Sequence, residues 1–269
     1  SPTELLINTY ETMNCTNLNI IDFDLNILKS FYYNYYVKSD GGKVYIPDKW
    51  EGIDMSVTMR YNNSSWEPNY IKSLINILKS SITEESNVVF QTIESLHMTL
   101  FHSFRTNMMD EFGRIIPMLD MSKWQHVKID LINLLVNQHT FDIIFKKIII
   151  TDTGAIILCG YPSNGTINKL QMLRNQIKSI HTYHGVPTKA VSNIFHMTIG
   201  KILPQSAYNE YNISQQNYTS LTQKITELNK TLQLLWNPST ISIIGSHSPI
   251  LSSSFTEVKL NINQHQIKI

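Results

Sequence analysis

Leu-His-Met-Thr-Leu at residues 96–100 returns in the second half of the chain as Phe-His-Met-Thr-Ile at residues 195–199. Residues i and i+2 of a β-strand lie on the same face. His97 and Thr99 are therefore expected on one face of a first strand, and His196 and Thr198 on one face of a second. The residues of the other face are apolar in both copies, which is typical of a strand that packs on a core. The repeat predicts two similar strands that each present an imidazole and a hydroxyl.

This combination of side chains suits chemistry at phosphorus. Imidazole titrates near neutral pH, so one histidine can accept a proton from the attacking oxygen while the other donates one to the leaving oxygen. A hydroxyl beside each histidine can donate a hydrogen bond to a non-bridging phosphate oxygen. We therefore interpret His97 and His196 as catalytic residues and Thr99 and Thr198 as substrate-binding residues.

The alternative is that each His-Met-Thr is an ordinary half-exposed strand pair. A single copy is best explained in that way. Histidine is scarce in this chain, with 9 among 269 residues. A repeat of the whole tripeptide between matching apolar flanks therefore favours the functional interpretation.

Hydrophobic periodicity and turn residues predict the remaining elements. Helices are expected at residues 3–13, 24–36, 67–82, 107–119, 168–185 and 206–235. Strands are expected at residues 53–61, 96–104, 126–136, 141–150, 154–160, 195–203, 240–245 and 255–262. Hairpins mix with helices without a strict βαβ rhythm, which favours the α+β class with antiparallel sheets.

The composition limits the class of protein. Hydrophobic residues make up 42% of the chain and charged residues 16%, which suffices for a sizeable core and excludes a disordered chain. The formal net charge of +1 lacks the basic excess of a protein that grips long nucleic acid, so a nucleic-acid substrate is expected to be small or held at an end. No apolar run is long enough to span a membrane. Cys15 and Cys159 are far apart, which indicates a reducing compartment, and we expect a cytoplasmic monomer.

Other histidines are candidate metal ligands. His181 and His184 lie three residues apart and could share a metal. They lack a third ligand at a suitable spacing, so we interpret them as a solvated helix end and expect neither a metal nor a cofactor. His126 and His139 are expected at the ends of the strand at 126–136.

Three further positions remain open between function and structure. Arg105 has the same parity as His97 and would reach a phosphate if the strand stays regular that far; otherwise it is a surface residue. Phe101 either stacks on a base or packs in the core. Arg60 and Lys201 are equally ambiguous.

The doubled His-x-Thr motif on apolar-flanked strands resembles the two-histidine phosphoesterase superfamily, which includes RNA cyclic phosphodiesterases and enzymes that destroy 2′-5′ oligoadenylate. The resemblance implies a bilobal, pseudo-twofold α+β fold, in which two antiparallel sheets form a central cleft and the helices lie outside. Only His97, Thr99, His196 and Thr198 carry over. We expect residues 1–50 to form a helical extension packed on a two-lobed domain at residues 51–269.

The function expected from this resemblance is metal-independent hydrolysis of a ribose phosphodiester. The substrate would be a 2′,3′-cyclic phosphate or a 2′-5′ linkage, carried by a nucleotide, a short oligonucleotide or an RNA end. The alternative is an inactive protein of the same fold that binds nucleotides or RNA ends without turnover. In a third interpretation, a structural partner-binding protein, the repeat is only a trace of duplication.

Overall fold

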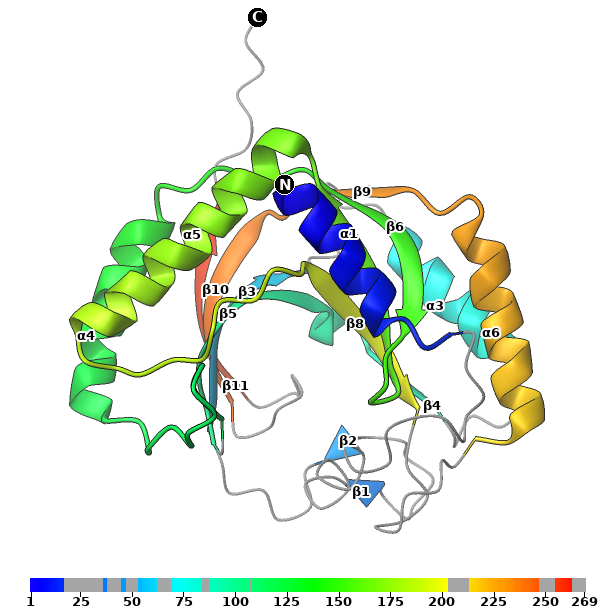
Figure 1. The fold of residues 1–269 in the computed structure, drawn as a ribbon, viewed down its shortest axis with the longest axis horizontal. Coiled ribbons are helices and arrows are strands. Elements are labelled where there is room, and N and C mark those ends of the chain that lie inside the picture. The colour runs from blue at the N-terminus through cyan, green and yellow to red at the C-terminus, as the bar shows by residue number, and fades with distance from the viewer. Residues whose placement is uncertain are drawn as a thin grey trace, which may run out of the picture.

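The structure is a computed structural model that describes residues 1–16, 36–37, 45–46, 53–61, 69–83, 88–106, 108–202, 213–246 and 255–262. Two antiparallel sheets dominate it (Figure 1). The four-stranded sheet has the order β11-β10-β3-β5 and the five-stranded sheet the order β4-β8-β7-β6-β9. A separate pair of short strands, β1 (Tyr36–Val37) and β2 (Tyr45–Ile46), is also antiparallel. The expected α+β class is confirmed.

The four-stranded sheet contains the first His-Met-Thr copy. Its strands are β3 (Asp54–Arg60), β5 (His97–Arg105), β10 (Thr240–Ser246) and β11 (Phe255–Asn261). The five-stranded sheet contains the second copy. Its strands are β4 (Val88–Phe90), β6 (Ile143–Ile150), β7 (Ala155–Pro162), β8 (His196–Ile202) and β9 (Leu234–Trp236). Each lobe therefore carries one motif strand.

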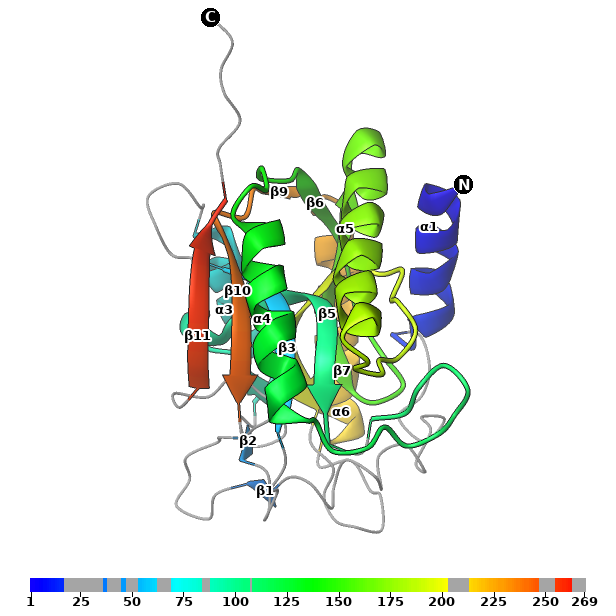
Figure 2. The ribbon, with the colours of Figure 1, turned by 90° about the vertical axis from the view of Figure 1, so that its left-hand side faces the viewer.

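The helices lie outside the sheets, as expected (Figures 1 and 2). Helices α4 (Met121–Leu135) and α5 (Asn164–Tyr183) pack on each other, and α5 packs against β5. Helices α3 (Tyr70–Ser80) and α6 (Gln215–Asn229) pack on each other on the opposite side of the molecule, where α6 covers β6. Helix α1 (Pro2–Met13) contacts α5 and β7, and the short 3-10 helix η2 (Ile93–Ser95) directly precedes β5. Each sheet thus has one helix pair on its outer side.

The strand expected at residues 126–136 is wrong, because this segment belongs to α4. Trp124, Val127, Leu131 and Leu135 are buried, and their spacing of three or four residues follows the helical period. The Asp120 carboxylate accepts hydrogen bonds from two backbone N–H groups of the first turn. His126 and His139 therefore do not mark the ends of a strand.

The helix expected at residues 107–119 is also wrong. Among its described residues, Met109 and Ile115 form an isolated antiparallel bridge. The Asp110 carboxylate accepts hydrogen bonds from the backbone N–H groups of Phe112 and Arg114. Gly113 has a φ of 78°, a left-handed conformation that suits glycine and ends any helix. Local side-chain bonds to the backbone therefore replace the helical ladder here.

The helix expected at residues 206–235 is shorter than predicted. Helix α6 spans Gln215–Asn229, and residues 203–212 lie outside the described part. The end of the predicted helix forms β9, which pairs with Ile143–Phe145 of β6. Trp236 is buried and stacks on Phe145 with ring centroids 5.9 Å apart. This aromatic contact between strands outweighs the helix propensity of the segment.

The remaining predicted elements are found within a few residues of their expected bounds, except the helix at 24–36. That helix lies outside the described residues apart from Tyr36, which begins β1. Of the proposed helical extension at residues 1–50, the structure describes α1, whose Leu6 and Tyr10 are buried against the core, and the short strands β1 and β2.

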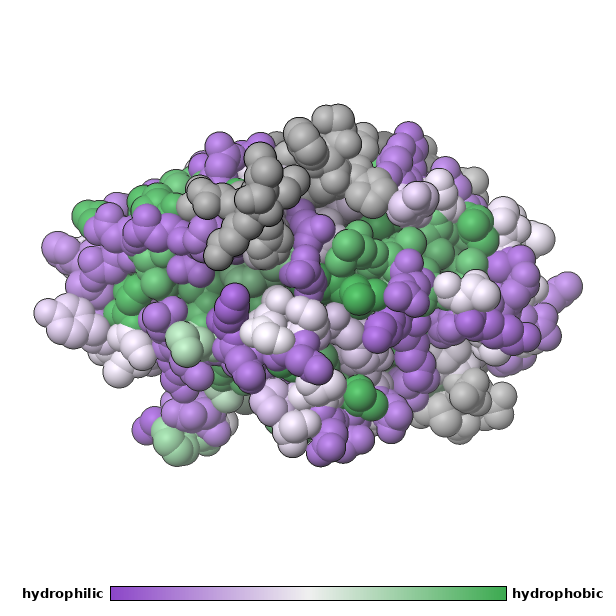
Figure 3. Space-filling view, turned by 90° about the horizontal axis from the view of Figure 1, so that it is seen from above, coloured by the Kyte–Doolittle hydropathy of each residue, from purple (hydrophilic) through white to green (hydrophobic). Residues whose placement is uncertain are grey.

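The surface of the described part is mixed. Figure 3 shows one face, on which apolar residues gather in separate patches among hydrophilic ones. In the described residues, no helix combines the length and the hydropathy that a membrane span requires.

His181 is not part of a solvated helix end, which corrects the sequence-based interpretation. Its side chain is fully buried, and its ring lies against Phe101 and Trp124 with centroid distances of 5.0 and 6.3 Å. Its Nδ1 lies 2.7 Å from the carbonyl oxygen of Ile177. Burial lowers the pKa of His181 from its usual 6.5 to about 4. The folded protein therefore keeps this imidazole neutral where an unfolded chain would protonate it.

The stability of the protein is expected to depend on this histidine below neutral pH. The unfolded chain binds a proton at His181 near pH 6.5, whereas the folded chain does so near pH 4. The contribution of the neutral ring to the free energy of unfolding is fully present above pH 6.5 and is lost as the pH falls from 6.5 towards 4. In His181→Leu, the slope of unfolding free energy against pH between these values should decrease by up to about 1.4 kcal/mol per pH unit.

Urea unfolding at a series of pH values measures this slope. Asn168→Leu, an exposed change on the same helix, is the control and should keep the wild-type slope. An unchanged slope in His181→Leu would contradict the assignment of a neutral buried ring.

Candidate functional site

The two His-Met-Thr strands are placed as the alternation predicts. His97, Thr99, His196 and Thr198 are half-buried, whereas Met98 and Met197 between them are fully buried. Strands β5 and β8 belong to different sheets and yet contact each other. The structure therefore brings the two copies together where the two sheets meet.

Both motif strands carry a β-bulge directly after the threonine. In β5, Thr99 pairs with Thr58 and Phe101 with the preceding residue of β3, so Leu100 is the extra residue. In β8, Thr198 pairs with Ile157 and Gly200 with the preceding residue of β7, so Ile199 is the extra residue. A bulge shifts by one the face on which all following side chains lie. The internal repeat therefore includes backbone geometry as well as residue type.

The bulges add His102 and Lys201 to the two histidine faces. In the strand pairing, His102 lies on the same face of β5 as His97, and Lys201 lies on the same face of β8 as His196. The two residues occupy equivalent positions of the two copies. Phe101 turns to the opposite side, where it is buried against His181. Of the two alternatives for Phe101, the structure places it in the core.

Arg105 lies on the same face of β5 as His97, although the strand is not regular between the two residues. A second register shift at Ser103 compensates for the first, so Arg105 pairs with Asp54 as His97 pairs with Arg60. In a regular strand, Arg105 would lie on the face of His97 by alternation alone. Two bulges whose effects cancel give the same result.

Strand β3 extends this face with a row of polar residues. Asp54, Ser56, Thr58 and Arg60 pair with the four residues of β5 that lie on the histidine side. The hydroxyls of Ser56 and Thr58 lie 2.9 Å apart and form a hydrogen bond. The described part of the four-stranded sheet thus presents a continuous polar surface beside the two histidines.

The end of the polar surface beyond His97 is hollowed. A cavity of about 200 Å³ is lined by residues that include Arg60, Glu94, Glu257 and Lys259. The guanidinium of Arg60 donates to both carboxylate oxygens of Glu257, at 3.0 and 3.2 Å. Arg60 is therefore engaged in the sheet, and its ambiguity in the sequence is settled in favour of a structural ion pair.

Both motif histidines are held neutral by their surroundings. Burial lowers the pKa of His97, partly offset by the hydrogen bond of its Nδ1 with the carbonyl oxygen of Ser95 at 2.7 Å. Burial lowers the pKa of His196 to about 4, with smaller contributions from the charges of Arg174, His97 and Lys189. The effect of His97 on His196, together with the contact between β5 and β8, indicates that the two imidazoles lie near each other in a weakly solvated site.

Arg174 of α5 connects the two motif strands. This side chain is 1% exposed. Its guanidinium donates to the carbonyl oxygens of Thr99 and Leu100 in the bulge of β5, at 3.3 and 2.8 Å. It also donates to the carbonyl oxygens of Ser192 and Ile194 just before β8, at 2.9 and 2.7 Å. One buried cation thus bonds both the backbone of β5 and the segment that leads into β8.

Tyr10 of α1 supports the second copy from behind. Its hydroxyl accepts from the backbone N–H of Phe195 at 2.9 Å and lies within 2.9 Å of the carbonyl oxygens of Phe195 and Gly160. A Cβ atom at Gly160 would lie 2.5 Å from the carbonyl oxygen of Phe195, so only glycine permits this close approach. The N-terminal helix therefore fixes the residue that precedes His196.

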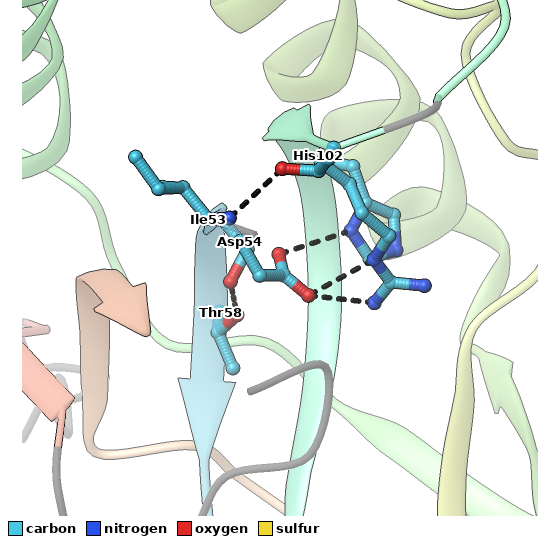
Figure 4. Close-up of polar contacts among 7 residues, drawn as sticks. Ile53, Asp54, Thr58 and His102 are labelled. Carbon is cyan, nitrogen blue, oxygen red and sulfur yellow. Dashed lines mark hydrogen bonds and ion pairs between the residues drawn. The ribbon is translucent and has the colours of Figure 1, made fainter. Parts of the chain in front are cut away.

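A second polar cluster lies at the other end of the β5 face (Figure 4). The Asp54 carboxylate accepts from Nε and Nη2 of Arg105 at 3.0 and 2.7 Å, and its other oxygen lies 4.0 Å from Nδ1 of His102. Burial lowers the pKa of His102 well below its usual value, and the charges of Arg105 and Lys189 add to this effect. His102 is therefore a third neutral imidazole of the site.

Sequence reasoning missed Arg174, His102 and Tyr10, although the first two left a signal. Arg174 occupies a position of the buried stripe of α5 that includes Ile167, Leu170 and Ile177. A charged residue in such a stripe indicates a buried, fully bonded cation. His102 and Lys201 follow their threonines at the same distance, so the repeat could have been extended by alignment. Tyr10 left no comparable signal, since its partners are backbone atoms distant in sequence.

The described part of the chain contains no group of three or more histidine, cysteine or acidic side chains arranged to hold a metal. His181 is buried, and His184 instead bonds the Asp130 carboxylate. The pair at the end of α5 is thus not arranged as a metal site.

Arg174→Met is expected to destabilise the fold strongly. The change leaves one buried and three partly buried carbonyl oxygens without their donor, and each unmet buried group costs about 1–3 kcal/mol. Urea unfolding should show a loss of about 3 kcal/mol or more. Arg174→Lys should recover only a small part, because an ammonium cannot reach all four oxygens. Lys169→Met, an exposed change on the same helix, should stay within about 0.5 kcal/mol of wild type. Equal stability of Arg174→Met and wild type would contradict the connecting role.

No protein-family model and no curated protein matches the sequence. Among solved structures, a conserved protein of unknown function from Agrobacterium tumefaciens matches with a TM-score of 0.52 at 10% identity, over 83% of this chain and 89% of that one. LigT of E. coli complexed with ATP matches with a TM-score of 0.44 at 12% identity, over 80% and 100%. A protein described as a phosphoesterase matches with a TM-score of 0.45 at 11% identity, over 78% and 99%. The likeness to the Agrobacterium tumefaciens protein is one of fold alone, and the resemblance to the two-histidine phosphoesterase superfamily rests on the doubled motif.

Proposed function

We propose that this protein is a metal-independent phosphodiesterase that hydrolyses a ribose phosphodiester, either a 2′,3′-cyclic phosphate or a 2′-5′ linkage. The observation that carries the proposal is the meeting of the two motif strands. His97 and His196 lie close enough for the charge of one to lower the pKa of the other, and each has a threonine hydroxyl on the same face. Two imidazoles and two hydroxyl donors then surround one phosphate.

In the proposed reaction, one neutral histidine takes a proton from water as its oxygen attacks phosphorus. The other histidine, protonated, donates to the ribose oxygen as the P–O bond breaks. One water is consumed and a phosphate monoester and a free hydroxyl are formed. Thr99 and Thr198 donate hydrogen bonds to the non-bridging oxygens, whose negative charge grows in the transition state.

The environment of the histidines favours this cycle at neutral pH. Burial lowers the pKa of both histidines, so a free base is available. A bound phosphodiester is an anion, and it raises the pKa of a neighbouring imidazole and so favours the protonated acid. The hydrogen bond between Nδ1 of His97 and the Ser95 carbonyl leaves Nε2 of that ring to exchange the proton.

The rival proposal is a protein of the same fold that binds nucleotides or RNA ends without turnover. A pure binder has no need of two coupled imidazoles, which favours the enzyme. Screening 2′,3′-cyclic nucleotides, 2′-5′ and 3′-5′ oligonucleotides and RNA ends with product analysis separates the two proposals. Binding without product in every case would favour the rival.

His97→Ala and His196→Ala are each expected to lower turnover by at least about 10²–10⁴-fold, because acid and base act in one step. The double variant should be hardly slower than either single variant, because groups that act as a unit are not additive. Circular dichroism and urea unfolding check that the variants fold. Near-normal turnover in either single variant would disprove the two-histidine mechanism.

Thr99→Val and Thr198→Val test the hydroxyls within the same assay. These changes keep the shape and the strand propensity but remove the donor. Each should lower kcat by roughly 10- to 1,000-fold. Thr226→Val, a change on the exposed side of α6, is the matched control and should leave kcat unchanged. Full activity in both motif variants would show that the threonines do not hold the phosphate.

Turnover is expected to persist after exhaustive chelation, since the imidazoles and hydroxyls supply the proton transfer and charge stabilisation that a metal gives elsewhere. The measurement is the initial rate with excess EDTA, with and without added Zn²⁺ or Mn²⁺. Activity that disappears with EDTA and returns with a metal would require a different mechanism.

A further inference from the structure

We propose that Arg105 and Lys189 form a second anion subsite, which binds a phosphate group next to the one that reacts. The substrate would then be a nucleotide or oligonucleotide end that carries a further phosphate beside the scissile phosphodiester. This inference rests on the proposed function and specifies its substrate class.

Arg105 is held in place with part of its donor set unused. Its Nε and Nη2 donate to one oxygen of Asp54, which fixes the plane of the guanidinium. Within the described part of the chain, its Nη1 makes no hydrogen bond or ion pair, and the side chain is 35% exposed. Figure 4 shows the Asp54 carboxylate and its polar contacts beside His102. A fixed guanidinium with a free edge is suited to bind an oxyanion.

Lys189 is a half-buried cation without a hydrogen-bond or ion-pair partner in the described part of the chain. It lies in the segment between α5 and β8, and its ammonium makes no hydrogen bond or ion pair with the described residues. Burial lowers its pKa, and the nearby Arg105 lowers it further, while Asp54 acts in the opposite direction. Because burial of an unpaired charge is costly, such lysines usually serve a ligand.

Arg105 and Lys189 lie near the same carboxylate, that of Asp54. Arg105 lowers the pKa of Lys201 as well as that of Lys189, with burial the larger cause in both, and the pKa of Lys201 falls to about 8. Arg105 already occupies one oxygen of Asp54. A bound dianion would relieve the repulsion between Arg105 and Lys189.

The subsite adjoins the reacting histidines. Along β5, His102 is the residue of the shared face between Thr99 and Arg105. The charges of Arg105, Lys189, His196 and His97 all lower the pKa of His102 beyond the effect of burial. His102 therefore lies near the two cations of the subsite and near the two reacting histidines. Neighbouring residues on one face of a strand are about 7 Å apart. A phosphate at Arg105 and Lys189 and a phosphate between the histidines would belong to one ligand.

The test compares two product-like ligands, adenosine 2′,5′-bisphosphate and adenosine 2′-monophosphate, by isothermal titration calorimetry. The wild-type protein is expected to bind the bisphosphate roughly tenfold or more tightly, which is the scale of one charge-assisted hydrogen-bonded contact. Lys189→Met should bring the ratio of the two dissociation constants close to one. Lys169→Met, which removes an exposed lysine on the outside of α5, should keep the wild-type ratio.

The outcomes separate this inference from the proposed function. A wild-type ratio near one, or an equal ratio in wild type and Lys189→Met, overturns the second subsite even if the protein hydrolyses phosphodiesters. A large ratio that depends on Lys189 supports the subsite, and does so even if no substrate is turned over, in which case the proposed function fails alone. In an active protein, a 5′-phosphorylated 2′,3′-cyclic nucleotide should also have a higher kcat/KM than its 5′-hydroxyl counterpart.

Discussion

The buried guanidinium of Arg174 is the interaction on which the arrangement of the site depends. The bulge in β5 turns carbonyl oxygens out of the sheet ladder, and the irregular segment before β8 does the same. Buried carbonyl groups need donors, and a single planar cation supplies them to both strands. Because Arg174 also lies over the Phe195 ring at 4.1 Å, the residue before His196 is fixed on its side chain as well as on its backbone.

The buried charge of Arg174 has an electrostatic consequence for the proposed reaction. Among the described residues the partners of Arg174 are neutral carbonyl groups, so no carboxylate there compensates its positive charge. Burial lowers the pKa of Arg174 only to about 10, so the guanidinium stays charged at neutral pH. That charge helps to lower the pKa of His196. The group that holds the two strands together therefore also keeps one of the reacting imidazoles in the form that can accept a proton.

The two copies are alike in backbone but differ in their surroundings. Both have a bulge after the threonine, and both add one further basic residue to the histidine face. In the first copy that residue is His102, beside Asp54 and Arg105. In the second it is Lys201, which burial and Arg105 keep at a pKa of about 8. A pseudo-symmetric fold can thus hold a symmetric phosphate while the rest of the ligand is recognised asymmetrically.

The sequence by itself determined the α+β class, the two motif strands and the face on which His97, Thr99, His196 and Thr198 lie, because strand alternation is a local property that apolar flanks reveal. It misassigned the segments at 107–119 and 126–136, where side-chain bonds to the backbone and a buried helical stripe decide the structure. Only the tertiary structure decided which residues surround the motifs. Arg174, Tyr10 and Lys189 reach the site from distant parts of the chain, and their partners are backbone atoms or charges that no sequence pattern specifies. The bulges that bring His102, Lys201 and Arg105 to the site depend on pairing with other strands, and register between strands is a property of the folded sheet rather than of either strand alone.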